Sequence, residues 1–238
     1  MTSIAVSQVV RRIRPFVGAA DTPDFFSMID QQARMIVNLA KVVAEVLQGK
    51  ESTHSLRLLD LEQRRQELQR RHQAVVHALP QSGLDEIRLT MEALDRAAAL
   101  LIRTGRDCHP GGSNPDAAAL QMMRVIRKAI ESLQHGYSRL ANGSTAAESD
   151  ADAAIASQSA LVFWRMSDQQ EAAAAEGQHL TAPSKVSLDR SCWLHGLYEN
   201  LDDIARELSG AGVILKVWSR QLSGAGGLAR LPQSFMVR

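Results

Sequence analysis

The stretch from about residue 188 to 222 carries apolar side chains at alternating steps of three and four residues without interruption. These positions are Leu194, Leu197, Leu201, Ile204, Leu208, Ala211, Leu215, Trp218 and Leu222. Because an α-helix turns once in about 3.6 residues, this spacing places the whole set on one face of a single helix. At about 1.5 Å per residue, that helix is about 50 Å long. Such a long apolar face must be covered by other helices, so the sequence predicts a helical bundle.

Five further stretches repeat this spacing and are separated by glycine, proline and asparagine residues. They cover about residues 21–48, 52–79, 84–104, 114–141 and 145–166. Residues from about 167 to 185 predict a poor helix or a mobile connection. No stretch alternates β-branched apolar residues with polar ones, so no sheet is expected. The predicted fold class is all-α: an antiparallel bundle of six long helices that cross at about 20°.

Local signals predict how some of these helices end and which face they bury. Gly49 follows the first stretch as a C-cap glycine, and the third stretch is expected to end before Gly105. The fifth stretch has a weaker apolar face, which consists of Ala151, Ile155, Val162 and Phe163.

The second helical stretch differs from the others because two positions of its apolar seam are polar, Arg65 and His72. The remaining seam positions are Leu58, Leu61, Leu68, Val75 and Leu79. A histidine on such a seam is more typical of a half-buried ring that packs between helices than of a metal ligand, and we expect this for His72.

Composition excludes several classes of protein. The chain has 27 Lys and Arg against 26 Asp and Glu, which gives no electrostatic reason to bind nucleic acid. No window holds 18 uncharged apolar residues, and Arg11, Arg12 and Arg14 follow the N-terminal apolar stretch instead of preceding it, which is wrong for a signal peptide. The two cysteines, Cys108 and Cys192, form no CxxC pair, so we expect reduced thiols in a cytoplasmic protein.

The sequence holds no motif that would make it an enzyme. It has no Walker loop, no GxSxG elbow and no HExxH pair. Cys108-His109 has no second ligand pair in sequence, so a zinc site is not expected. Gly224-x-Gly226-x-x-Ala229 spells a dinucleotide fingerprint but follows a helix where a strand is needed. We therefore expect a protein without catalytic residues.

The opening of the first helical stretch, Phe25-Phe26-x-x-Ile29-x-x-Gln32-Ala33, resembles the start of the PhoU-like phosphate transport regulators, which accompany Pit-type phosphate permeases. The resemblance extends over about residues 24–218. It implies a non-enzymatic cytoplasmic accessory protein that regulates inorganic phosphate transport by binding a permease or another membrane-associated partner. A peripheral place at the inner membrane face and a homo-oligomer are left open.

The resemblance also implies a division of the chain, since the family is built from two three-helix repeats. Residues 21–105 would form the first repeat and residues 106–223 the second, together making one compact domain. Residues 1–20 are expected to be a flexible leader, and residues 224–238 a frayed tail.

The family signature is an acid-x-x-x-Asp pair on successive helices, and in relatives these pairs hold metal ions. In the first repeat Glu62 and Asp95 keep the leading acids, but Gln66 and Ala99 stand where the second acids belong. A hard divalent ion takes about six oxygen ligands, which two single acids cannot supply. We therefore predict no metal at the first-repeat site.

The second repeat keeps more of the signature. Glu148 and Asp152 retain both acids, although Thr145-x-x-Glu148 is also the spelling of a capping box. Either nothing or one weakly bound metal ion is predicted there, and no other cofactor.

The last helical stretch contributes Leu197-Tyr198-Glu199-Asn200-Leu201-Asp202, which is similar to the family's Leu-Tyr-Glu-x-Leu-Glu run. That alignment puts Arg206 where a second acid is expected, and Arg206 would then pair with Asp202 one turn away. A shifted alignment uses Glu199 and Asp203 in its place. Both assignments remain open.

Arg57, Arg64 and Arg71 recur every seven residues and form one basic stripe on the second helical stretch. The ordinary interpretation is a set of ion pairs one turn apart, Asp60 with Arg64 and Glu67 with Arg71. The alternative is a docking surface for an acidic partner.

Two functions from other classes compete with that of a phosphate transport regulator. One is a metal-binding helical bundle, with ligands among the acids of the second repeat. The other is a purely structural helical adaptor, which the polar seam of the second stretch would suit.

Overall fold

The computed structural model describes residues 25–77, 85–108, 117–142, 144, 146–176 and 185–225. These residues contain no strand, and their helices are α2 (Phe25–Leu47), α3 (Leu56–His77), α4 (Asp85–Arg106), α5 (Ala117–Ala141), α6 (Ala147–Glu176) and α7 (Lys185–Ala225). The predicted all-α class with six long helices is thereby confirmed for the described part of the chain. The predicted leader, 1–20, lies outside the described residues, as does the predicted tail except for Gly224 and Ala225, which end α7.

The period of α7 is borne out by its burial. Seven of its predicted seam positions are buried: Leu197, Leu201, Ile204, Leu208, Ala211, Leu215 and Trp218. Tyr198 and Ala205, each next to a seam residue, are buried as well. Leu194 is partly buried against the same core. The seam therefore faces the other helices along most of the helix.

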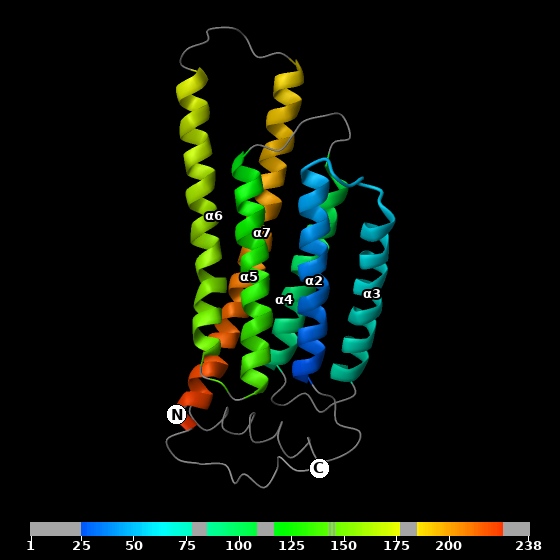
Figure 1. Cartoon of the computed structure of the whole chain (residues 1–238), viewed down its shortest axis with the longest axis vertical. Coiled ribbons are helices and arrows are strands. Elements are labelled where there is room, and N and C mark those ends of the chain that lie inside the picture. Colours follow the sequence, from blue (N-terminus) through cyan, green and yellow to red (C-terminus); the bar gives the residue numbers. More distant parts are fainter. Residues whose placement is uncertain are drawn as a thin grey trace.

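The helices pack side by side, and Figure 1 shows each one running in the opposite direction to the one before it. Helices α2, α3 and α4 all touch one another, as do α5, α6 and α7, and the contacts of α2 with α5 and of α4 with α7 join the two sets. Among the described helices α3 touches only α2 and α4, and α6 touches only α5 and α7. These two helices therefore lie at opposite edges (Figure 1). None of the described helices combines the length and apolar composition needed to cross a membrane.

The C-terminus of α2 follows the predicted signal. Gly49 has a φ of 69°, its N–H donates to the Val46 carbonyl at 2.9 Å, and the Lys50 N–H donates to the Glu45 carbonyl at 2.8 Å. This is a Schellman motif, in which a left-handed residue satisfies the last carbonyls of the helix. Glycine suits the position because it lacks the Cβ that penalises positive φ.

Two helix ends differ from their predicted places. Helix α3 begins at Leu56, four residues later than expected, because the Ser55 hydroxyl accepts a hydrogen bond from the Leu58 N–H and caps the helix there. Helix α4 continues through Gly105 to Arg106. A Cβ on Gly105 would lie 3.3 Å from Val43, so this glycine serves close packing against α2 and does not end the helix.

The fifth helix is longer than expected, and its buried face differs from the predicted one. Of the stretch 167–185, predicted to be a poor helix or a mobile connection, residues 167–176 continue α6 to Glu176, and residues 177–184 lie outside the described residues. The Ala-, Gln- and Glu-rich sequence of this extension has high helix propensity. Val162 and Phe163 are largely exposed and do not form the buried face. The residues that α6 does bury are small for the most part: Ala147, Ala151, Ala154, Ser157 and Leu161.

Small residues let α6 approach its neighbours closely. A Cβ on Gly212 of α7 would lie 3.2 Å from both the Ala151 carbonyl and the Ala154 Cβ of α6. A Cβ on Gly136 of α5 would lie 3.1 Å from the Asp150 Cβ. The close packing of α6 therefore depends on the absence of a Cβ atom at Gly136 of α5 and Gly212 of α7.

Two glycines of α7 should respond in opposite ways to alanine. Gly210 is exposed, and a Cβ added to it would meet no atom within 4 Å, so Gly210→Ala should raise the free energy of unfolding by about 1 kcal/mol through helix propensity. Gly212→Ala should lower it by about 1 kcal/mol, since overpacking costs about 1–3 kcal/mol and outweighs that gain. Urea denaturation of both variants measures this. Equal stabilisation by both would contradict the close packing of α6 on α7.

Candidate functional site: the acids of the predicted metal motif

The first-repeat acid Asp95 lies on α4 and faces α3. The Arg65 guanidinium donates to it from Nε and from Nη2, both at 2.8 Å, in a two-point pair. Only 18% of the Arg65 side chain and 14% of the Asp95 side chain are exposed. The polar seam position predicted for Arg65 is therefore the position from which α3 reaches the carboxylate on α4.

For Glu62, the other first-repeat acid, the roles of the two helices are reversed: α3 supplies the acid and α4 the arginine. Glu62 of α3 is paired with Arg106 of α4. Gln66 carries a neutral amide and Ala99 only a methyl group, so neither adds a carboxylate beside these acids. Each of the two helices thus supplies one acid and one arginine to the other.

The second-repeat acids lie along the contact of α6 with α7. Glu148 accepts a hydrogen bond from Arg220 Nε at 2.7 Å, and Asp152 accepts one from Lys216 Nζ at 2.6 Å. The antiparallel register continues with Arg165, which donates to Asp202 at 2.7 Å. As in the first repeat, the basic partner comes from the neighbouring helix.

This register keeps the acids of the predicted second site apart. Asp202 is level with Arg165, which is 13 residues, or about 20 Å, along α6 from Asp152. Glu199 is paired with His195 at 3.2 Å, one turn away on the same helix. The structure does not bring these acids together around one point.

The ion pair predicted between Asp202 and Arg206 is not the one observed. Arg206 contacts Asp203 at 2.5 Å, and Asp202 points to Arg165. The prediction was wrong because sequence spacing shows partners on the same helix and cannot show a base on the neighbouring one.

The acids of both repeats therefore serve as anchors for side-chain cations. Within the described residues, no group of three or more His, Cys, Asp or Glu side chains is placed to hold a metal ion. A guanidinium or ammonium needs only one nearby carboxylate, whereas a hard metal ion needs several that converge. The arrangement can join helices through charge pairs, chiefly α3 to α4 and α6 to α7.

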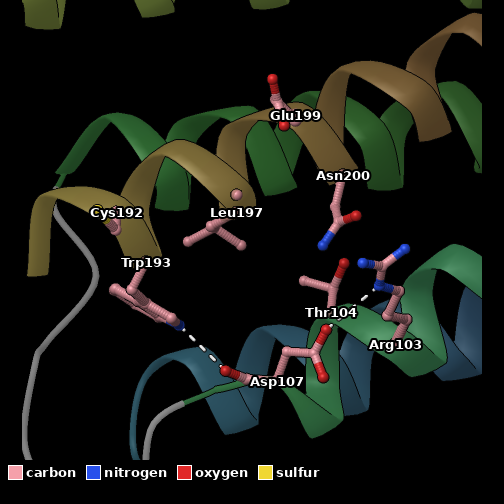
Figure 2. A pocket seen from close by; sticks show the side chains of 9 residues that line it. Arg103, Thr104, Asp107, Cys192, Trp193, Leu197, Glu199 and Asn200 are labelled. Atoms are coloured by element: carbon pink, nitrogen blue, oxygen red, sulfur yellow. Dashed lines mark hydrogen bonds and ion pairs between the residues drawn. The ribbon is translucent and has the colours of Figure 1, made fainter. Parts of the chain in front are cut away.

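A cleft of about 250 Å³ lies between the C-terminal end of α4 and the N-terminal part of α7. The Trp193 indole donates to the Asp107 carbonyl at 3.1 Å, and Arg103 is paired with Asp107. Figure 2 shows Asn200 and Arg103 pointing toward each other across the cleft, with the Glu199 carboxylate directed away from them. The charges that line it are largely satisfied within the protein.

The described residues that line the cleft include no activated nucleophile. Cys192 is exposed on its wall, and no basic side chain that lines the cleft is hydrogen-bonded to it. The other thiol, Cys108, is buried, and burial raises its pKa to about 11, so it stays protonated near neutral pH. The described part of this cleft therefore offers neither residue of a nucleophile and base pair.

The basic stripe of α3 divides into two parts. Arg57 contacts Glu45 of α2 at 2.6 Å and Glu51 at 3.0 Å; the hydrogen bond to Glu45 raises the pKa of the guanidinium, and Glu51 adds to the effect. Arg57 thus ties the start of α3 to the end of α2. Arg64 and Arg71 instead form the predicted ion pairs one turn apart within α3.

Sequence reasoning placed Tyr137 on the inward face of the fourth helical stretch, where it is buried, but missed two hydrogen bonds that buried side chains make between helices. Gln32 of α2 donates to the Met91 carbonyl of α4 at 2.9 Å, and Tyr137 of α5 donates to the Ala211 carbonyl of α7 at 3.0 Å. Burial raises the pKa of Tyr137, so it remains a donor. Tyr137 sits at a predicted inward position, and Gln32 is buried directly beside the seam residue Ala33, so the available signal is a polar side chain on or next to the buried face of a helix.

His72 is buried, as its seam position predicts, but more completely than half. Its side chain is 4% exposed, and Nε2 has no hydrogen-bond partner in the described part of the chain. Burial lowers the pKa of His72, and the nearby charge of Arg71 lowers it further, while Asp95 acts in the opposite direction. The neutral ring is therefore the form that the fold prefers.

Comparison of the chain with protein-family models, with curated proteins and with solved structures finds no match. The resemblance to the PhoU-like regulators consequently depends on the sequence motifs quoted above.

The buried histidine predicts a loss of stability in mild acid. In the unfolded chain His72 binds a proton near pH 6.5, whereas in the folded chain it does so only at lower pH. The free energy of unfolding should therefore fall as the pH drops below about 6.5, and less steeply in His72→Leu. Urea denaturation from pH 7.5 to 5 measures the difference, with His135→Leu at an exposed position as the control. Identical pH profiles for wild type and His72→Leu would contradict this.

Removing the side-chain cations of α7 should create metal affinity. In Lys216→Gln, Arg220→Gln, the acids Glu148 and Asp152 stay one turn apart without a counter-charge, so Mn²⁺ binding measured by calorimetry should exceed that of the wild type. Arg34→Gln on α2, which leaves both pairs intact and frees only Asp30, an acid with no second acid one turn away, is the matched control and should bind as the wild type does. Two or more tightly held ions per wild-type chain would contradict the assignment of these acids to ion pairs.

Proposed function

We propose that this chain is a non-enzymatic accessory protein of inorganic phosphate transport, which acts in the cytoplasm by binding a permease at the inner membrane face. The observation that carries the proposal is where the motif acids fall. Glu62 and Asp95 lie at the contact of α3 with α4, and Glu148, Asp152 and Asp202 lie at the contact of α6 with α7. These are the second and third helices of each half of the chain, as two three-helix repeats with the family signature require.

The charge pairs support a function that does not depend on a bound metal. Each of these five acids meets a cationic side chain from a neighbouring helix, so these positions join helices whether or not an ion is present. The acids of the shifted alignment, Glu199 and Asp203, pair within α7. The cleft between α4 and α7, which lacks an activated nucleophile, supports a binding role over a catalytic one. Among the described residues, no group of acids is placed to support the metal-binding alternative in a comparable way.

Deletion of the gene in its native host tests the proposal. The initial rate of uptake of radiolabelled phosphate at limiting phosphate should change, and expression of the full chain should restore it. Uptake of an unrelated solute such as an amino acid should not change, which controls for a general membrane effect. Unchanged phosphate uptake in the deletion strain would contradict the proposal.

The same assay tests whether metal is needed. Glu148→Gln, Asp152→Asn should restore uptake as the wild type does, because the neutral side chains still donate and accept hydrogen bonds at the contact of α6 with α7. Leu201→Asp, which puts a charge into the core, should fail through unfolding, as circular dichroism would show.

A further inference from the structure

The two halves of α3 are attached to the rest of the molecule in different ways. This helix lies at one edge, where among the described helices it touches only α2 and α4 (Figure 1). In its first half Leu58 and Leu61 are buried in the core. Ion pairs join the same half to the two neighbouring helices: Arg57 with Glu45, Glu62 with Arg106, and Arg65 with Asp95. Apolar contacts and charge pairs therefore act together on the first half.

The second half of α3, residues 66–77, has fewer attachments. Among its described side chains only His72 is fully buried, with 4% exposed, and Leu68, Val75 and Val76 are partly buried against the core. Within the described part of the chain, no ion pair joins this half to another helix, since Arg71 pairs with Glu67 inside α3. One histidine is therefore the principal buried contact of the second half.

The position of His72 suits a neutral ring and not a protonated one. Its Nε2 is buried and has no hydrogen-bond partner among the described residues. A protonated ring needs an acceptor at that nitrogen, and a buried charge without one is costly. Asp95 is the carboxylate whose charge favours protonation. Both of its oxygens already accept hydrogen bonds from Arg65, at 2.8 Å each, so it is not free to accept one from the ring.

The charges around His72 come from α3 and α4. Burial is the largest cause that lowers the pKa of the ring; Arg71 on α3 lowers it further, and Asp95 on α4 raises it. Among the described residues, no charged side chain of α2 changes this balance. Other charged residues of α2 and α4 pair among themselves: Asp30 with Arg34, and Arg88 with Glu92.

We propose that protonation of His72 releases the second half of α3 from α2 and α4, while the first half stays attached. A neutral ring packs in the core and holds the segment in place. A protonated ring is better solvated in water, so the segment leaves the core with it. The half-buried pair of Arg65 with Asp95 limits the release to the residues that follow it. Met35 of α2, which is buried and lines a groove between α2 and α3, becomes accessible.

This release is a local opening, distinct from unfolding of the whole chain, and linkage gives its size. In the released segment the ring lies in water and binds a proton near pH 6.5, whereas in the packed segment it does so only at lower pH. Packing of the segment is therefore most stable above pH 6.5 and weakens below it. A drop from pH 7.5 to pH 5.5 should favour the released state by about tenfold. The first half of α3 contains no histidine and should not respond.

Hydrogen–deuterium exchange of the full chain, read by mass spectrometry, tests the proposal. Protection factors of amides 70–77, corrected for the intrinsic exchange rate at each pH, should fall about tenfold from pH 7.5 to pH 5.5. Amides 58–65 should change much less. In His72→Leu the second half should keep its protection at both pH values, because an apolar side chain does not titrate. In His72→Arg it should be poorly protected at both, because the charge is permanent.

His77→Gln is the matched control, since it removes the other histidine of this half, and its protection should fall as in the wild type. Three results would overturn the proposal: protection of 70–77 that does not change with pH, an equal fall in every helix, or a fall that persists in His72→Leu. Loss of the effect in His77→Gln would assign the response to that histidine and also reject it. Circular dichroism at each pH checks that the bundle is folded.

Discussion

The position of α3 depends on the half-buried pair between Arg65 and Asp95. This helix is strongly polar and touches only α2 and α4 among the described helices, so few apolar contacts hold it. Asp95 lies at the contact with α4, where a carboxylate without a counter-charge would be costly. Removing one partner of a fully buried pair costs about 3–5 kcal/mol, against at most about 1 kcal/mol for an exposed one. Less than a fifth of each side chain is exposed, so the cost of breaking this pair is closer to that of a fully buried pair. The Arg65 guanidinium therefore fixes how α3 packs against α4.

The need for a counter-charge also explains the surroundings of the other acids that lie between helices. A carboxylate at a helix contact can be neutralised by a metal ion or by a basic side chain. The metal requires several acids at one point, and the base requires one acid and a suitable register. Along α6 and α7 the pairs of Glu148 with Arg220, Asp152 with Lys216 and Arg165 with Asp202 follow one antiparallel register. Charges that alternate in this way between helices specify register as well as compensate burial.

Sequence alone predicted the features that depend on local pattern. The seam of α7 and the end of α2 at Gly49 were correct because apolar spacing and a left-handed glycine are written within one helix. The predicted face of α6 was wrong because its buried residues are mostly alanine and serine, which differ little in hydrophobicity from the exposed side of the helix. The larger apolar residues Val162 and Phe163 were therefore assigned to the buried face, although they are exposed. The bases that pair with Glu148 and Asp152 come from more than sixty residues away, and only the register of the packed helices identifies them.

Helix geometry separates two uses of arginine on α3. Successive residues are rotated by about 100°, so Arg64 and Arg71, seven apart, share a face, while Arg65 points about a quarter turn away from Arg64. Arg65 is 18% exposed and bonds to α4, whereas Arg64 and Arg71 are more than half exposed and pair within α3. Exposed pairs one turn apart contribute at most about 1 kcal/mol, so the inner arginine is the one that attaches α3 to the bundle. The polar seam that makes α3 unusual in sequence thus marks the face by which this helix is held.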